Sequence, residues 1–143
     1  MLVGDEIELD VTVQPAGTAV SWATSDNTVL SVSDGVVTAE GAGTATVTAT
    51  AGELTATYTA TVTEPSVTLS DETKEIAVSG SATLTATTIP SNAEITWESD
   101  DTAVASVTDG VVSGLTAGTA TISATITVNS IDYYDTCEVT VAE

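Results

Sequence analysis

The sequence predicts an all-β protein made of two tandem β-sandwiches, because of its composition, its alternating pattern and an internal repeat. Thr (30 residues), Ala (20) and Val (19) dominate the chain of 143 residues, whereas Leu occurs only 7 times. Thr and Val are branched at Cβ, which favours extended strands. Apolar and polar residues alternate along most of the chain, and disordered acidic chains lack such rows. We therefore expect a folded protein built of strands.

The chain repeats itself at an offset of 75 residues. Three segments of the first copy, Val20–Asp26, Asp34–Val37 and Gly43–Val47, recur as Ile95–Asp101, Asp109–Val112 and Gly118–Ile122. The second copy then carries four extra residues. The two copies join at a short linker near 63–66, which predicts a first domain over 1–64 and a second over 65–143.

Each copy contains strands with a period of two residues. In the first copy Ile7, Leu9, Val11 and Val13 alternate with polar residues, and Ala82, Leu84 and Ala86 do so in the second. Asp-Gly between apolar residues predicts a tight hairpin at Asp34–Gly35 and again at Asp109–Gly110. Later strands contain Val47 in the first copy and Ala120, Ile122, Ala124 and Ile126 in the second.

The predicted core is one inward row from each of these strands. Trp22 and Trp97 are expected to plug the space between the two sheets of their copies. Cys137 falls on the same phase as Val139 and Val141, so we expect a buried, unreactive thiol. The remaining predicted core residues are Leu9, Val47, Leu84 and Ile122.

The charge and the missing residue types exclude several classes of function. A net charge of −20, with Lys74 as the only basic residue, disfavours nucleic acids and anionic lipid surfaces. The absence of His removes His-based catalysis and His metal sites, and one Cys cannot form an intrachain disulfide. Apolar runs are too short to insert into a membrane. The loop carboxylates (Asp26, Asp34, Asp100, Asp101 and Asp109) lack the spacing of a calcium loop. We expect no enzyme, no cofactor and no metal site.

The repeated segments resemble bacterial immunoglobulin-like domains of group 2. That family is marked by a W-x-S-D/S-x-x-x-V-x-x-V segment, here Trp22 to Val32 and Trp97 to Val107. A D-G-x-V hairpin and a G-T-A-T-[IV] strand follow in both copies. The resemblance covers nearly the whole chain and implies Greek-key, Ig-like sandwiches without catalytic activity. Such modules occur in bacterial surface proteins, as spacers or adhesive units, and on the tails and capsids of phages.

The four extra residues lengthen the last hairpin of the second copy, with Asn129 and Ser130 at or near its tip. In the Ig-like topology this hairpin points toward the first copy. We therefore expect Val128, Ile131 and Tyr134, beside Asn129, to brace the junction between the domains. Binding of a partner by the same tip is the alternative.

The first copy departs from the second at its beginning. The second opens with Pro65–Ser70 and continues through Ile76–Val78, which would form its first strand and its continuation, and the first copy has no counterpart. Either the chain was cut inside a longer protein or the first domain lacks its N-terminal strand. A missing strand leaves an open edge, which could accept a strand from another chain or allow self-association.

These features favour a structural or display module on an extracellular surface, with a protein or possibly a surface glycan as partner. The first segment, Met1–Asp5, is not a signal peptide. If Met1 is the native start, a capsid or tail decoration or spacer on a phage virion fits better than a bacterial cell-surface protein. Two alternatives stay open. One is a fragment of a bacterial adhesin that binds a host glycan or protein, and the other is an assembly subunit that accepts a strand.

Overall fold

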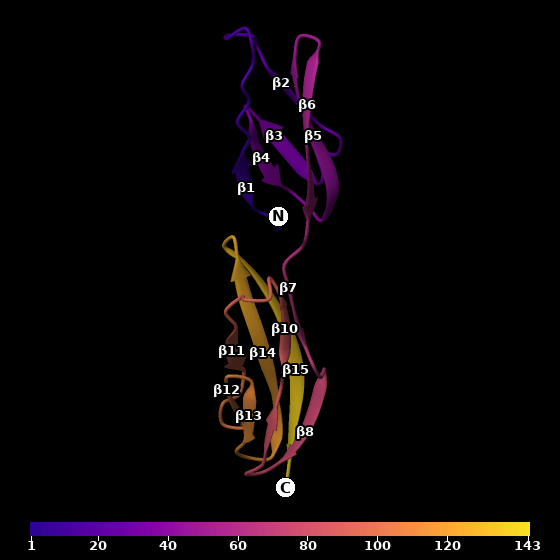
Figure 1. Ribbon diagram of the computed structural model, residues 1–143. Helices are drawn as coiled ribbons and strands as arrows, with labels where there is room; N and C mark the ends of the chain where they lie inside the picture. The colour runs from indigo at the N-terminus through magenta and orange to yellow at the C-terminus, as the bar shows by residue number, and fades with distance from the viewer. The chain divides into compact units, whose positions relative to one another are not determined.

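The computed structural model describes residues 1–143, and all of its regular elements are β-strands (Figure 1). The prediction of an all-β class is therefore confirmed. The chain divides into two units, Met1–Glu64 and Pro65–Glu143. No helix in the structure is long and apolar enough to cross a lipid bilayer.

Unit 1 is Met1–Glu64, and it contains two three-stranded antiparallel sheets. One has the order β1-β4-β3 and the other β2-β5-β6. Leu30 and Val37 from the first sheet and Val47 from the second are buried in a shared core. The strands are β1 (Glu6–Glu8), β2 (Ser21–Thr24), β3 (Leu30–Ser33), β4 (Val36–Ala39), β5 (Gly43–Ala51) and β6 (Leu54–Val62).

Unit 2 is Pro65–Glu143, and it has a four-stranded sheet of order β11-β14-β15-β8. Its other strands form the sheets β12-β13-β9 and β10-β7. Ile122 and Val139 of the large sheet share one core with Leu84, Val112 and Val67. The strands are β7 (Ser66–Leu69), β8 (Thr73–Ala77), β9 (Ser81–Thr83), β10 (Ala86–Ile89), β11 (Thr96–Ser99), β12 (Ala105–Thr108), β13 (Val111–Gly114), β14 (Gly118–Val128) and β15 (Ile131–Ala142).

The internal repeat of the sequence is also a repeat of structure. Adding 75 to the bounds of β1, β2, β3 and β4 gives the bounds of β9, β11, β12 and β13. The pairing register repeats as well, since Ile7 lies opposite Val37 as Ala82 lies opposite Val112. The two copies therefore adopt the same arrangement over most of their length.

Alternation of residue types produces the sandwich directly. Along β14, Ala120, Ile122, Ala124 and Ile126 are buried, while the Thr and Ser residues between them are more exposed. Successive side chains of a strand point to opposite faces. One face of the hairpin β14–β15 therefore carries the apolar row and covers the core.

The Asp-Gly turns bring the chain close to a tryptophan in both units. Asp109 and Gly110 both have positive φ (48° and 79°), as Asp34 and Gly35 do (49° and 89°). A Cβ at Gly110 would lie 3.1 Å from Cζ2 of Trp97. Glycine at this position thus serves both the backbone conformation and the packing of the indole ring.

The predicted strand over residues 6–13 is wrong in its extent. β1 ends at Glu8, and residues 9–13 form no strand. In unit 2 the matching chain resumes as β10, which is paired with β7. A strand requires a hydrogen-bonded neighbour, and unit 1 has no strand in the place of β7.

The prediction that the first copy has no counterpart of 65–78 also needs one correction. Leu2 forms a parallel bridge with Thr63, and the amide of Val3 donates to the Thr63 carbonyl at 3.1 Å. The corresponding pair in unit 2 is Ala77 with Ala142, the last pair between β8 and β15. Residues 1–3 thus take the place of the end of β8.

Candidate functional site

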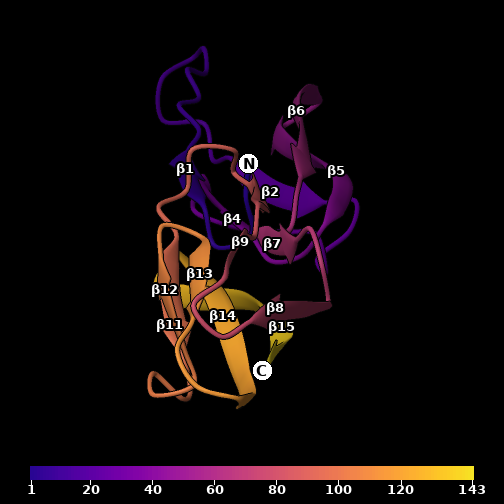
Figure 2. The same cartoon turned by 90° about the horizontal axis from the view of Figure 1, so that it is seen from below.

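An open apolar groove lies on the surface of unit 1 and is wide enough to receive part of a partner. The groove has a volume of about 280 Å³. It lies between the chain that follows β1 and the hairpin β5–β6, two segments that Figures 1 and 2 show facing each other. Its lining residues are Val11, Thr12, Val13, Gln14, Val20, Ala49, Ala51, Leu54, Thr55 and Ala56.

A smaller hollow of about 140 Å³ continues this groove toward the core. Val11, Ala49 and Ala56 line both spaces, and Trp22 and Tyr58 line the inner one. We use the term unit-1 groove for the two spaces together. Val11 is 39% exposed and Leu54 is 65% exposed, although both are aliphatic. The unit-1 groove is thus an apolar surface that its own unit does not cover.

The same place in unit 2 is filled by β7. β7 pairs with β10 over four residues, from Leu69 opposite Ala86 to Ser66 opposite Ile89. Val67 and Leu69 are buried, at 7% and 9% exposure. The amide of Leu69 also donates a hydrogen bond of 2.8 Å to the Asp135 carboxylate on β15. β7 is therefore held from both sides.

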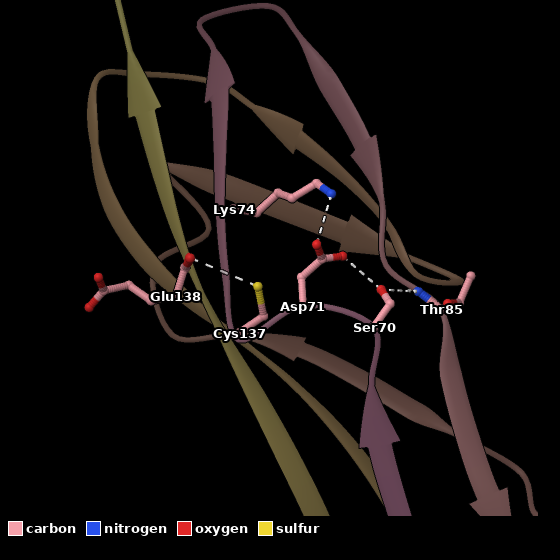
Figure 3. A network of polar contacts seen from close by, with 6 residues as sticks. All are labelled: Ser70, Asp71, Lys74, Thr85, Cys137 and Glu138. Carbon is pink, nitrogen blue, oxygen red and sulfur yellow. Dashed lines mark hydrogen bonds and ion pairs between the residues drawn. The ribbon is translucent and has the colours of Figure 1, made fainter.

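A polar cluster fixes the corner where the chain leaves β7 for β8 (Figure 3). The Ser70 hydroxyl donates to Asp71 at 2.8 Å, and Lys74 forms an ion pair of 3.2 Å with the other Asp71 oxygen. The Ser70 hydroxyl also accepts a hydrogen bond from the amide of Thr85. The hydrogen bond from Ser70 first, and then the contact with Lys74, lower the pKa of Asp71 below its ordinary value. Ser70, Asp71 and Lys74, which follow β7 in the chain, have no equivalent in unit 1.

Cys137 lies beside this cluster with its thiol buried. Burial raises the pKa of the thiol, which keeps it protonated and unreactive. Its sulfur lies 3.8 Å from the carbonyl oxygen of Glu138. Cys137 pairs with Ile122 across β14 and β15, so it serves as a small apolar core residue.

The other predicted core residues lie at different depths. Val47, Leu84 and Ile122 are buried, at 1%, 2% and 0% exposure. Trp22, Trp97 and Leu9 are half-buried and pack against the cores of their units. Leu9 is the counterpart of Leu84. Leu9 is the less buried of the two, because unit 1 has no equivalent of the strand that neighbours Leu84 in unit 2.

The tip of the hairpin β14–β15 is a second exposed apolar feature. Asn129 and Ser130 form its turn, with φ of 51° and 65°. Val128 is half-buried against the core of unit 2, whereas Ile131 and Tyr134 are 48% and 71% exposed. The role of these four residues at a junction between the domains stays a prediction.

Three of the loop carboxylates, Asp26, Asp100 and Asp101, accept hydrogen bonds from backbone amides of their own unit. Asp26 accepts hydrogen bonds from the amide and the hydroxyl of Thr28, which lower its pKa, the hydroxyl first. Asp100 accepts a 2.7 Å hydrogen bond from the amide of Thr121, which lowers its pKa too. No group of three or more His, Cys, Asp or Glu side chains is placed to hold a metal ion.

Sequence reasoning identified an open edge but missed the residues of the unit-1 groove. Ala49, Ala51 and Ala56 were not singled out, because an alanine row looks like ordinary core. A signal was available in Leu54, an aliphatic residue at the turn of the hairpin that contains these alanines. Its exposed position indicates that this strand pair is uncovered.

Comparison with known proteins supports the family assignment for the second unit. Residues 64–132 match the family model of the bacterial Ig-like domain (group 2). No curated protein matches the chain.

Several solved structures are similar to the chain. A crystal structure of the S-layer protein rSbsC is 26% identical with a TM-score of 0.45, and the match covers 92% of this chain but 21% of that one. Domains 4 and 5 of SbsC are 24% identical with a TM-score of 0.45, covering 96% and 80% of the two chains. Human protocadherin-24 EC1-2 is 8% identical with a TM-score of 0.43, covering 96% and 87%.

The family match begins one residue before unit 2 and ends inside β15. It includes Trp97, the Asp109–Gly110 turn and the strand that opens at Gly118, which are the motifs that carried the resemblance. Residues 64–132 therefore match the family of bacterial Ig-like domains of group 2, which is the family that the repeated motifs resemble.

Proposed function

We propose that this chain is a non-catalytic structural and display module on an extracellular surface, and that the surface is that of a phage virion. The observation that carries the proposal is the way in which the two units of the chain are built. One sandwich design is used twice, each unit has its own apolar core, and the second is a bacterial Ig-like domain. The virion half rests on the occurrence of such modules on phage tails and capsids.

The solvent faces of the strands suit a module that stays dissolved and unbound over most of its surface. On β5 and β6, Thr44 faces Thr61 and Thr46 faces Thr59, with hydroxyl oxygens 3.0 and 2.9 Å apart. Such cross-strand Thr pairs stabilise a sheet without an apolar exterior. The net charge of −20 makes copies of the chain repel one another and other acidic surfaces.

An adhesive function is the second candidate, and the hairpin tip of unit 2 favours it. Tyr134 is 71% exposed, and Ile131, three residues earlier on the same strand, is 48% exposed. Exposed aromatic rings provide the contact area and the hydroxyl with which proteins commonly bind sugars and other proteins. A host glycan or protein would be the ligand in this case.

Labelling with an antibody against residues 1–143 tests the display proposal. Purified phage particles and bacterial envelopes from the same culture are compared by immunogold electron microscopy. We expect label on the particles. Label confined to the envelopes would overturn the virion half, and label confined to the cell interior would overturn the extracellular role altogether.

A glycan and host-protein array tests the adhesive candidate. The chain is compared with Tyr134→Ala and with Val36→Asp, a control at an exposed position of unit 1. Specific binding that Tyr134→Ala abolishes and Val36→Asp retains would favour adhesion over display. The display proposal expects no specific binding from any of the three.

A further inference from the structure

β8 and β15 form a parallel pair that joins an early strand of unit 2 to its last strand. Five residue pairs link them, the last of which is Ala77 opposite Ala142. The ladder continues beyond both ends of β8. The amide of Glu138 donates to the carbonyl of Glu72 at 2.9 Å, and the amide of Val78 donates to the carbonyl of Ala142 at 2.8 Å. The whole length of β8 is therefore bonded to β15.

The parallel direction of the two strands decides how a pulling force acts on them. The chain enters unit 2 ahead of β8 and leaves it after β15, and both strands run toward the end of unit 2 where the C-terminus lies (Figure 1). Tension between residues 65 and 143 pulls β8 back toward its beginning and β15 forward toward its end. The strands are then drawn in opposite directions along their own axes, so the bonds between them are loaded in shear, all at once.

We propose that unit 2 is a tension-bearing module, and that the parallel pair of β8 and β15 is the clamp through which it resists being pulled open. A display module joins a surface to what it presents, so a force on the presented part passes along the chain. This inference goes beyond the proposed function, because it assigns a mechanical role that holds on whichever surface displays the chain.

The inward side of the β8–β15 clamp is packed into the core of unit 2. Ile76 on β8 is 7% exposed, and Val139 and Val141 on β15 are 0% and 2% exposed. A Cβ at Gly114 on β13 would lie 3.2 Å from Cδ1 of Ile76 and 3.0 Å from Cγ1 of Val141. β13 therefore lies directly against the clamp. Sliding of β8 along β15 has to disrupt this close packing together with the hydrogen bonds.

Both ends of β8 are also fastened to other parts of unit 2. Ahead of it, β7 is paired with β10, and the polar cluster of Figure 3 holds the corner between β7 and β8. After it, the amide of Ser79 donates to the carbonyl of Gly114 at 2.9 Å, and the amide of Gly114 donates to the carbonyl of Gly80 at 3.0 Å. These ties keep β8 in line with β15 under load and prevent it from swinging outward.

The test pulls one protein in two directions. The full chain with Ser79→Cys is stretched in optical tweezers, once by peptide tags at residues 1 and 143 and once by a handle on the new cysteine and the tag at 143. Cys137 is buried and does not compete for the handle. Because Ala77 lies opposite Ala142, residues 79 and 143 leave the clamp at the same end. The second direction therefore peels β15 from β8 one residue pair at a time, in a protein of the same stability.

We expect unit 2 to open at a force about twofold higher or more between the terminal tags than from residue 79. Forced unfolding follows the unfolding barrier, and in shear about five residue pairs have to part together. The opening of unit 2 is recognised by the length of chain that it releases. Unit 1 is an internal comparison, because its parallel pairing is the single bridge of Leu2 with Thr63, and it should open at a lower force in the same recordings.

Two proline variants locate the clamp on β8. Alternate residues of a strand point their amides at the same neighbour. The amide of Val78 donates to β15, so that of Lys74 does too, while that of Glu75 points away at the edge of the sheet. Proline is tolerated on an edge strand where its nitrogen faces outward. Lys74→Pro should lower the force between the terminal tags toward the peeling value, and Glu75→Pro should retain most of it. Lys74→Ala, which loses the ion pair with Asp71, should retain it as well.

Three results would overturn the proposal. The first is an equal force in the two pulling directions, because general stability would then explain the resistance. The second is an equal loss of force in Lys74→Pro and Glu75→Pro. The third is a unit 1 that resists as strongly as unit 2, since one bridge would then do as much as five pairs. The comparison of pulling directions needs no proline variant, so it decides the matter even if Lys74→Pro does not fold.

Discussion

Gly110 lies where the Asp109–Gly110 turn meets the neighbouring chain, and it has no room for a methyl group. A Cβ there would be 2.5 Å from the carbonyl oxygen of Leu84. The amide of Leu84 donates a hydrogen bond to the carbonyl of Gly110 in the same region. The same Cβ would meet the ring of Trp97 at 3.1 Å. Positive φ and close contact therefore act on one residue.

We expect Gly110→Ala to lower the free energy of unfolding of unit 2 by more than Gly52→Ala lowers that of unit 1. Gly52 also has positive φ (64°), but a Cβ there would meet nothing within 4 Å. Gly52→Ala therefore measures the backbone strain alone, which is about 1–2 kcal/mol. Urea unfolding of each unit, followed by NMR, measures both losses. Equal losses of unfolding free energy would mean that the atoms around Gly110 move aside without an energetic penalty.

Trp97 packs against the core of unit 2 and is half-buried. We expect Trp97→Ala to destabilise unit 2 by about 3–5 kcal/mol, as removal of a large core side chain typically does. This is a large part of the stability of a small domain. Calorimetry is the measurement, with Tyr134→Ala as an exposed aromatic control. An unchanged transition would show that Trp97 does not support the core.

Asp100 and Ser25 occupy equivalent positions and accept the same kind of hydrogen bond. The amide of Thr121 donates to Asp100 at 2.7 Å, and that of Thr46 donates to the Ser25 hydroxyl at 2.9 Å. Only Asp100 can titrate, and this hydrogen bond lowers its pKa in the folded state. Its stabilisation is therefore full above the ordinary aspartate pKa of about 3.9 and is lost as the pH falls through the lower folded-state pKa.

Asp100→Ser should make unit 2 less sensitive to acid, because the hydroxyl keeps an acceptor that does not titrate. Melting of unit 2 is measured from neutral pH down to strongly acidic pH in both proteins. The loss of stability on acidification should be smaller in the variant, while Asp71 leaves part of it in place. An identical acid profile would assign the sensitivity to other carboxylates.

At the scale of elements, β7 is what distinguishes the two units. β10 and residues 11–14 are matching stretches, and only the one with a neighbour is a strand. The hydrogen bond from Leu69 to Asp135 and the Ser70–Asp71–Lys74 cluster hold β7 and the corner after it (Figure 3).

Weakening β7 should make unit 2 behave like unit 1. Leu69→Ala removes a buried side chain and should cost about 2–5 kcal/mol. We expect the loss to be local first, with amide exchange at residues 86–89 accelerating toward that of residues 11–14, because β10 depends on β7. Thr68→Ala is the control, since Thr68 is exposed on the same strand. Uniform acceleration throughout unit 2 would show that β7 does not open separately.

At the scale of the whole molecule, charge is the dominant feature. Twenty-one carboxylates face one Lys, which forms an ion pair with Asp71. Such an excess of one sign repels itself in the folded state and keeps the chain dissolved.

Added salt should therefore raise the melting temperature of this protein. The Debye length falls from about 10 Å at 0.1 M to about 3 Å at 1 M ionic strength, so repulsion between surface carboxylates is screened. Differential scanning calorimetry in sodium chloride over that range measures the effect. The single ion pair loses little by comparison, since exposed pairs contribute about 0–1 kcal/mol. A melting temperature that falls with salt would contradict this view.

Much of the fold was predictable because the relevant interactions are local or periodic. Alternation in residues such as Ala120, Ile122 and Ala124 predicts a strand and its buried face. The Asp-Gly pairs predict hairpins because both positions tolerate positive φ, and the structure has positive φ at Asp34 and Gly35. The repeat at 75 residues extends these inferences from one unit to the other.

The unit-1 groove, in contrast, was decided by tertiary structure. Val11 and Val13 continue the alternating pattern of Ile7 and Leu9, yet they form no strand, because a strand exists only with a hydrogen-bonded neighbour. Local pattern is enough to specify which residues alternate, which turns form and which units repeat. Whether an apolar row is covered depends on a partner strand from elsewhere in the fold, and only the three-dimensional arrangement shows that β7 covers one row and leaves the other open.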